Sequence, residues 1–288
     1  MNCEVKCLKS LKFPHSFMSS ARFAQIVMGP AGSGKSSYIQ RMIEHFEVSK
    51  RNVRSINLDP AAESLCYVPS VNITDALDVR EIMEKYGEGP NGALIHCMET
   101  IVDDFEWFDE VIGENDNDYL LIDLPGQIEL FSHLNILPRL FSNLLRKRYH
   151  LCTVFLLDSQ FMCDSAKFLS GCLVAISAMT MMETPHINLL SKCDLLSEDQ
   201  RATLEEFCNM DITMLGENLN EKSGKIDILT TRICELIQQY NLVSFIPFDP
   251  TNEEMVTQAA GQIDMVLNYY EDGEFEETNS IQNLEENE

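Results

Sequence analysis

One segment constrains the fold of this chain more than any other, the stretch G-P-A-G-S-G-K-S that ends at Ser36. It follows the apolar run Phe23–Met28 and precedes the helical pattern Ser36–Phe46. A strand, a turn of the form G-x-x-x-x-G-K-S and a helix together form a phosphate-binding loop, in which backbone N–H groups and the helix N-terminus face an anion. Lys35 would neutralise phosphate charge, and Ser36 would ligate Mg²⁺. The residues expected to contact phosphate are Gly29, Pro30, Ala31, Gly32, Ser33, Gly34, Lys35, Ser36 and Ser37.

The rest of the chain repeats the alternation of short apolar runs and longer amphipathic segments. The runs lack a clean apolar–polar alternation, as expected of strands covered on both faces. Strand–helix–strand repetition predicts right-handed crossovers and an α/β fold with a mostly parallel sheet flanked by helices. Strands are expected at Phe23–Met28, Val53–Leu58, Tyr119–Leu124, Leu151–Leu157, His186–Leu190 and Val243–Phe248. Helices are expected at Ser36–Phe46, Asn91–Ile112, Leu134–Arg148, Lys167–Met182, Ile226–Tyr240 and Glu253–Tyr270.

The chain is expected to form one domain. Its 288 residues are 45% apolar, which is enough for a full core, and no internal linker or repeat stands out. We place a P-loop NTPase G-domain, with helical insertions, at 22–270. Residues 1–21 are expected to form a loose extension. Residues 271–288 carry eight acidic residues and no basic one, and are expected to form an acidic disordered tail.

The charge balance limits the partners of this chain. The 21 basic and 46 acidic residues give a net charge of −25, which argues against direct binding to nucleic acid or to an anionic membrane. No apolar run approaches the ~20 residues of a membrane span, and the best candidate, Cys172–Met182, is too short. The ten cysteines include no C-x-x-C pair, so the sequence predicts a reducing compartment and no zinc site.

A second motif, D-L-P-G-Q, begins at the end of the expected strand Tyr119–Leu124. Asp123 stands where a carboxylate supports Mg²⁺ in P-loop proteins. Gly126 lets the backbone approach a γ-phosphate, and Gln127 stands where many GTPases carry the glutamine that orients the attacking water. The alternative is an ordinary Pro-Gly turn. Because the two motifs follow in order, each after its own strand, the functional interpretation is favoured.

A third motif, S-K-C-D, follows the expected strand His186–Leu190 and is close to the guanine-reading pattern N-K-x-D. Asp194 would accept hydrogen bonds from N1–H and the N2 amino group of guanine, whereas the N1 lone pair of adenine would repel the same carboxylate. The stem of Lys192 can lie over the base. Ser191 replaces Asn and loses an amide that braces the loop. The alternative is that Asp194 only caps the following helix.

Two further turns carry polar side chains. Asp59 follows the expected strand Val53–Leu58 at the edge that faces the phosphate loop, where it would hold Mg²⁺ or polarise water. The alternative is a plain Asp-Pro turn. The residues G-P-N-G at 89–92 predict a rigid, exposed turn before a helix, with one amide side chain. From the residues alone, a turn is all that this segment indicates.

Taken together, the motifs resemble the GPN-loop GTPase family. The resemblance runs from about residue 22 to residue 272 and includes N-L-D-P-A at 57–61, G-P-N at 89–91 and D-L-P-G-Q-I-E at 123–129. It implies a dimer that binds GTP or GDP and in which Asn91 reaches the phosphate site. It also implies that Asp59, Gln127 and Glu129 prepare the attacking water. The Mg²⁺ site that it implies consists of Ser36, Asp59 and Asp123.

Some details resemble the third eukaryotic paralogue of this family, such as D-S-Q-F-M at 158–162, although the second paralogue shares much of the framework. The resemblance implies a heterodimer with the first paralogue, with a homodimer as the alternative. It also implies work on RNA polymerase II subunits, in assembly and nuclear import of that enzyme, from a cytoplasmic location with shuttling to the nucleus. Two other interpretations stay open: an ATP-dependent phosphotransferase, and a nucleotide-stabilised subunit of a heterodimer that does not hydrolyse GTP.

Overall fold

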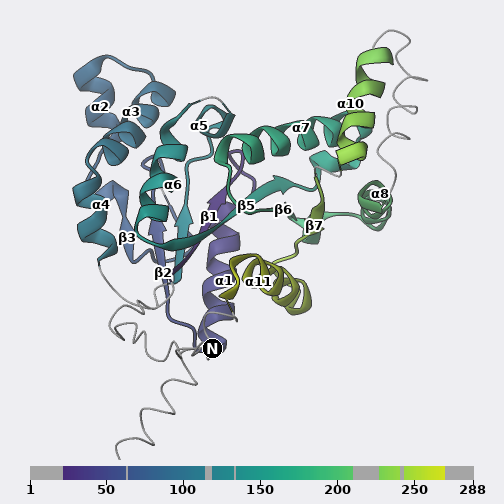
Figure 1. The fold of residues 1–288 in the computed structure, drawn as a ribbon, viewed down its shortest axis with the longest axis horizontal. Coiled ribbons are helices and arrows are strands. Elements are labelled where there is room, and N and C mark those ends of the chain that lie inside the picture. Colours follow the sequence, from purple (N-terminus) through teal and green to yellow (C-terminus); the bar gives the residue numbers. More distant parts are fainter. Residues whose placement is uncertain are drawn as a thin grey trace, which may run out of the picture.

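The computed structural model describes residues 22–62, 64–113, 119–132, 134–209, 227–240 and 243–269. The expected extension at 1–21 and the expected tail at 271–288 lie outside these residues. A seven-stranded sheet with the order β3-β2-β4-β1-β5-β6-β7 forms the centre, and every pairing in it is parallel (Figure 1). The predicted α/β fold is confirmed. The strands are β1 (Arg22–Met28), β2 (Val53–Asn57), β3 (Val71–Asn72), β4 (Tyr119–Asp123), β5 (Tyr149–Asp158), β6 (His186–Ser191) and β7 (Phe245–Pro247).

Helices connect the strands and cover the sheet. They are α1 (Lys35–Val48), α2 (Val79–Tyr86), α3 (Pro90–Asp103), α4 (Phe105–Ile112), α5 (Ile128–Ser132), α6 (Ile136–Arg146), α7 (Ser165–Met182), α8 (Glu198–Asn209), α10 (Asp227–Tyr240) and α11 (Glu253–Leu267). Short 3-10 turns lie at η1 (Ile73–Asp75), η2 (Phe161–Cys163) and η3 (Cys193–Leu195).

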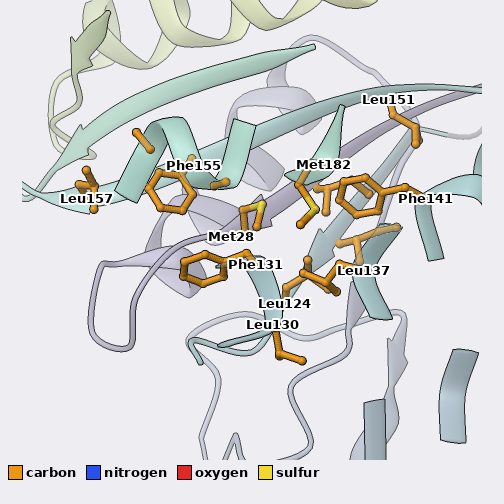
Figure 2. Packing of buried hydrophobic residues seen from close by; sticks show 14 of the residues in the cluster. Met28, Leu124, Leu130, Phe131, Leu137, Phe141, Leu151, Phe155, Leu157 and Met182 are labelled. Atoms are coloured by element: carbon orange, nitrogen blue, oxygen red, sulfur yellow. The ribbon is translucent and has the colours of Figure 1, made fainter. Parts of the chain in front are cut away.

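The central strands carry apolar side chains on both faces, so an apolar core lies on each side of the sheet. In β1, Ile26 and Met28 pack in a core with α3 to α7, whereas Val27 packs in a second core with α1 and α11. Figure 2 shows the first core, in which Phe131 of α5 lies near Phe155 of β5. Burying both faces of a strand stabilises the sheet but leaves its ends as the place for polar side chains.

Several elements differ from the sequence expectations. The expected helix Asn91–Ile112 is wrong, because Asp104 takes a non-helical conformation and separates α3 from α4. The elements β3, α2, α5 and α8 have no counterpart among the expected ones. β3 is two residues long, which is too short to leave a period. α2 does carry apolar residues at helical spacing, among them Val79, Ile82 and Met83, although none of them is fully buried.

α7 extends beyond the run Cys172–Met182, which alone is too short for a membrane span. Yet α7 is long and apolar enough to cross a membrane by length and composition, and it is the one such helix among the described residues. Its buried side chains, which include Phe168 and Cys172, pack into the first core.

The parallel topology brings the carboxyl ends of all strands to one edge of the sheet. The strand register aligns these ends closely. Asn57 at the end of β2 pairs with Asp123 at the end of β4, and Asp158 at the end of β5 pairs with Ser191 at the end of β6. β1 ends between them at Met28, directly before the phosphate-binding loop. Three of the sequence motifs therefore begin at the carboxyl ends of neighbouring or nearby strands, at the same edge of the sheet.

Candidate functional site

The loop after β1 has the backbone geometry that only glycine adopts without strain. Gly29 has φ 146°, and a Cβ there would lie 2.3 Å from the carbonyl oxygen of Leu156. Gly126, in the turn after β4, faces the loop in the same way, because a Cβ on it would lie 2.7 Å from the backbone of Ala31. The N–H of Ala31 donates to the carbonyl oxygen of Gly126 over 3.1 Å. The two motifs are thus in direct backbone contact.

Lys35 lies inside this loop at the start of α1. Its side chain is buried, and its Nζ donates to the carbonyl oxygens of Gly29 and Pro30 over 3.2 and 3.4 Å. Burial lowers the pKa of Lys35, and the nearby carboxylates of Asp123 and Asp59 oppose this effect. A desolvated ammonium held by loop carbonyls is a strong partner for phosphate oxygens, because each bond to it is charge-assisted.

Asp123 lies almost completely buried opposite Lys35. Its Oδ2 accepts hydrogen bonds from the hydroxyls of Ser36 and Tyr67, each over 3.1 Å. Its Oδ1 is buried and has no hydrogen-bond donor among the described residues. Burial raises the pKa of Asp123 to about 6, while Lys35, Ser36 and Tyr67 act to lower it. A buried carboxylate oxygen without a partner indicates that a ligand completes this site.

The donors at this place fit Mg²⁺. They are oxygen atoms of a hydroxyl and of carboxylates, which are the ligands that Mg²⁺ prefers. No group of three or more His, Cys, Asp or Glu side chains that could hold a metal occurs in the described part of the chain. Mg²⁺ is commonly held by one or two carboxylates, with phosphate oxygens and water completing its shell. The residues that would hold it are Ser36, Asp123 and Asp59.

Asp59 stabilises its own turn and also lies at the candidate site. Its Oδ1 accepts from the N–H of Ala61 over 2.9 Å, as the plain-turn alternative predicted. Its own N–H donates to the side chain of Asn57, which is bonded in turn to Asn72 of β3. Burial raises the pKa of Asp59, although Lys35 and the bond from Ala61 oppose the shift. The turn holds this carboxylate at the wall of the cavity described next.

A cavity of about 530 Å³ lies at this edge of the sheet. Gln127 lines it, and the Oε1 atom of Gln127 is buried without a hydrogen-bond donor among the described residues. Glu129 on α5 and Asn91 in the first turn of α3 do not line it, and Asn91 is exposed. The residues that line it are Ala31, Gly32, Gly34, Lys35, Ser36, Ser37, Asp59, Ala61, Ala62, Ser64, Leu65, Asp123, Gly126, Gln127 and Lys192.

The turn after β6 braces the phosphate-binding loop. The buried hydroxyl of Ser191 lies 2.6 Å from the carbonyl oxygen of Ser33 and 3.1 Å from that of Leu157. The amide of Asn is absent, as expected, but the hydroxyl of Ser191 bonds the loop in its place. Lys192, with φ 60°, donates from Nζ to Oδ2 of Asp158 over 2.7 Å and lines the cavity.

Asp194 lies in the turn η3 and is half-buried. Its carboxylate accepts no hydrogen bond from the described residues. The alternative that it caps the next helix is wrong, because α8 begins at Glu198 and Ser197 performs the capping. Ser197 Oγ accepts from the N–H of Gln200, and the Gln200 side chain accepts from the N–H of Ser197. Asp194 is left with an open pair of acceptor oxygens, although it is not among the residues that line the cavity.

Two side chains at this site were not singled out in the sequence. Asp158 stands at the carboxyl end of β5, and the rule that directed attention to Asp123 would have found it. Tyr67 lies in an irregular loop, and neither spacing nor periodicity marks it. Its role in the site comes from a contact over 56 residues of sequence separation.

Comparisons with known proteins agree with this geometry. A family model described as a conserved hypothetical ATP binding protein matches residues 27–269. The chain is 43% identical to GPN-loop GTPase 3 of Xenopus tropicalis, over 89% of this chain and 91% of that protein. It is 37% identical to GPN-loop GTPase 3 of Saccharomyces cerevisiae, over 92% of this chain and 100% of that protein. The chain belongs to the GPN-loop GTPase family.

Within the GPN-loop GTPase family, the shared name of these relatives confirms the resemblance to the third paralogue. A solved structure supports the fold independently. The crystal structure of a GTPase in apo form from Pyrococcus abyssi matches with a TM-score of 0.74 and 25% identity. The match covers 87% of this chain and 98% of that one, so the arrangement of sheet and helices is shared over nearly the whole length.

Proposed function

We propose that this chain binds GTP with Mg²⁺ and hydrolyses the bond to the γ-phosphate. One observation supports the proposal. A single cavity is lined by the buried ammonium group of Lys35, the carboxylates of Asp59 and Asp123, and Gln127, whose amide oxygen accepts no hydrogen bond from the described residues. Phosphoryl transfer needs positioning and charge stabilisation rather than covalent chemistry, and these groups supply both. The names of the relatives and of the Pyrococcus abyssi structure support the same activity.

The residues divide the work by their place in the cavity. Lys35 and the N–H groups of the loop bind the β- and γ-phosphates. Ser36, Asp123 and Asp59 hold Mg²⁺, which when bound spreads the developing negative charge of the phosphates. Gln127 orients the attacking water through its amide. Asp59, with a pKa raised by burial, lies at the cavity wall where it can accept a hydrogen bond from that water.

Guanine is the base that the described residues favour. The description of the family model refers to ATP, whereas the relatives are named GTPases. Asp194 decides between them on chemical grounds, since its open carboxylate suits the two N–H donors of guanine and repels the N1 lone pair of adenine. Competition of GTP and ATP for a bound fluorescent guanine nucleotide tests this choice. Equal affinity would leave the ATP-dependent phosphotransferase as the better interpretation.

Dimerisation completes the site in this proposal. Asn91 is exposed at the start of α3 and does not line the cavity of its own chain. Its implied contact with the phosphates is then made to the site of a partner. The partner is the first paralogue of the family, with a second copy of this chain as the alternative. Glu129 on α5, outside the cavity in this chain, supports the water when the dimer closes.

The cellular role follows from the resemblance alone. We infer that the chain acts on RNA polymerase II subunits, in assembly and nuclear import of that enzyme, in the cytoplasm with shuttling to the nucleus. A tagged chain should then co-purify with the first paralogue and with polymerase subunits, and its depletion should leave those subunits in the cytoplasm. Normal nuclear polymerase after depletion would contradict this role.

Single-turnover hydrolysis tests the enzymatic part. Excess protein is mixed with GTP labelled at the γ-phosphate, with and without the first paralogue, and phosphate release is followed. Release should exceed that of a Lys35→Ala control in at least one of the two conditions. If neither exceeds the control while GTP still binds, the chain is a nucleotide-stabilised subunit and the GTPase proposal is wrong.

A further inference from the structure

Tyr67 makes a contact with the Mg²⁺ site that the proposed function does not assign. Its hydroxyl donates to Oδ2 of Asp123 over 3.1 Å, on the oxygen that also accepts from Ser36. The two donors come from different elements, the loop between β2 and β3 and the helix α1. Two bonds to one oxygen from two directions fix the rotation of the carboxylate group, because turning it breaks both.

Tyr67 is the main side-chain anchor of its loop, whose backbone is also joined to β2 by the N–H of Ser70, which donates to the carbonyl oxygen of Ser55 over 2.8 Å. Among the described residues of 61–70, Tyr67 alone is buried, and its neighbours Cys66 and Val68 are exposed. The ring of Tyr67 belongs to the apolar core of α1 and α11, and Leu65 packs against the same core. The same loop provides five residues of the cavity wall. These are Asp59, Ala61, Ala62, Ser64 and Leu65.

We propose that Tyr67 is a positioning residue for Mg²⁺ binding, whose hydroxyl holds the Asp123 carboxylate so that Oδ1 stays without a protein partner and open to the cation. This inference rests on the proposed function. The observation behind it is the asymmetry of Asp123, in which two hydroxyls occupy Oδ2 and no described donor reaches Oδ1. Hydrogen bonds from groups behind a metal ligand orient it and tune its affinity, so the loss of such a bond is felt at the metal.

The burial of Asp123 makes this orientation hard to replace. Asp123 is 2% exposed, so solvent water has little access to Oδ2 to take the place of a lost hydroxyl. Tyr67 therefore acts on Mg²⁺ affinity through the orientation of the Asp123 carboxylate.

The variant Tyr67→Phe removes the hydroxyl and keeps the ring in the core. Mn²⁺ replaces Mg²⁺ as the probe, because its electron paramagnetic resonance signal reports binding without turnover. Titration of Mn²⁺ into the complex of the full chain with GDP should show an affinity about tenfold weaker for Tyr67→Phe than for the natural chain. The affinity for fluorescent GDP in EDTA should stay within about twofold, because this binding does not involve the metal.

The pair of measurements separates a positioning role from a structural one. If the hydroxyl only anchors the loop, Tyr67→Phe would lower GDP affinity in EDTA as much as it lowers Mn²⁺ affinity, and this result would overturn the inference. Unchanged Mn²⁺ affinity would overturn it too. The matched control is Tyr86→Phe, an exposed tyrosine at the end of α2, for which both affinities should stay within about twofold. Thermal unfolding of each variant sets a measuring temperature at which all of them are folded.

Failure of the proposed function gives a different result. If the natural chain binds no GDP, the nucleotide assignment is wrong. If it binds GDP equally with and without Mn²⁺, the metal assignment is wrong, and in both cases the Tyr67 inference is wrong too. If the natural chain shows metal-dependent GDP binding and Tyr67→Phe does not weaken Mn²⁺ binding, the proposed function stands and the Tyr67 inference alone is wrong.

Discussion

Two turns in this chain begin with the same pair of residues and have different surroundings. Gly29-Pro30 opens the loop before α1, and Gly89-Pro90 opens the first turn of α3. The first loop is held by Gly126 and Ser191 and encloses a buried lysine. The second is exposed, and the N–H of Ala93 donates to the carbonyl oxygen of Gly89 at the start of its own helix. Gly-Pro marks a turn in both places, but only the contacts around it tell whether the turn forms a site.

This difference indicates where one chain is complete and where it is not. Around the phosphate-binding loop, Lys35, the carboxylates of Asp59 and Asp123, and Gln127 line one cavity. The tip with Asn91 is exposed, and in our proposal it acts on the site of a partner. Perturbing the first loop should affect nucleotide binding in a single chain, whereas perturbing the tip should affect only a step that requires the dimer. The predictions below test this division.

Lys35→Ala should have the largest effect. It removes charge-assisted bonds to the phosphates, so the affinity for GTP should fall about 100-fold. Equilibrium binding of a fluorescent GTP analogue to the single chain measures this loss. Lys167→Ala, on the exposed surface of α7, is the control and should leave affinity unchanged. A loss below about threefold would mean that the loop carbonyls, rather than phosphate, are the true partners of Lys35.

Asp194→Asn should have the next largest effect, at the base end of the site. The amide accepts one hydrogen bond in place of a charged bidentate pair, so GTP affinity should fall about 10- to 50-fold. The preference for GTP over ATP should shrink by the same factor, as measured by competition. Asp199→Asn on α8 removes the same charge from an exposed helix and should change neither value. Equal losses for GTP and ATP would show that Asp194 acts on the turn and not on the base.

The fold was largely predictable because the strands are buried on both faces. β1, β4 and β5 appear in the sequence as short apolar runs, and the structure places all three in the middle of the sheet. The break at Asp104 was not predictable, because the apolar residues of α3 and α4 continue one pattern across it. α2 was detectable, because Val79, Ile82 and Met83 stand at helical spacing, but the helix has only eight residues and its apolar residues are not fully buried.

The site was predictable to the extent that it follows strand ends. Asp59, Asp123 and Lys192 all lie after strands, and all line the cavity. The sequence also contains a signal against capping by Asp194, since S-E-D-Q at 197–200 is a capping box. Tyr67 could not be found in this way. A single aromatic residue in an irregular loop gains its meaning only from a partner far away in the sequence.

Asn91→Ala should have a smaller effect, and only in the dimer. It removes one hydrogen-bonding side chain from an exposed tip, so the single-turnover rate should fall about tenfold while GTP affinity stays within about twofold. The rate loss should vanish at protein concentrations too low for dimers. Glu99→Gln, an exposed change further along α3, is the control. An equal loss in the isolated chain would show that the tip serves its own cavity and that the two turns are alike.

Ser191→Ala should have the smallest effect. It tests the contact between the end of β6 and the phosphate-binding loop. The substitution removes the hydroxyl that bonds the Ser33 carbonyl and leaves that buried acceptor without its donor. The free energy of unfolding should fall by about 1 kcal/mol and GTP affinity by about threefold, because the loop loses a brace but keeps Lys35. Urea unfolding and equilibrium binding measure the two values. Ser170→Ala, which removes an exposed hydroxyl bonded within α7, is the matched control. If GTP affinity falls as far as in Lys35→Ala, the hydroxyl of Ser191 contributes as much to binding as the charge of Lys35. The function of the loop would then depend on its contact with the end of β6.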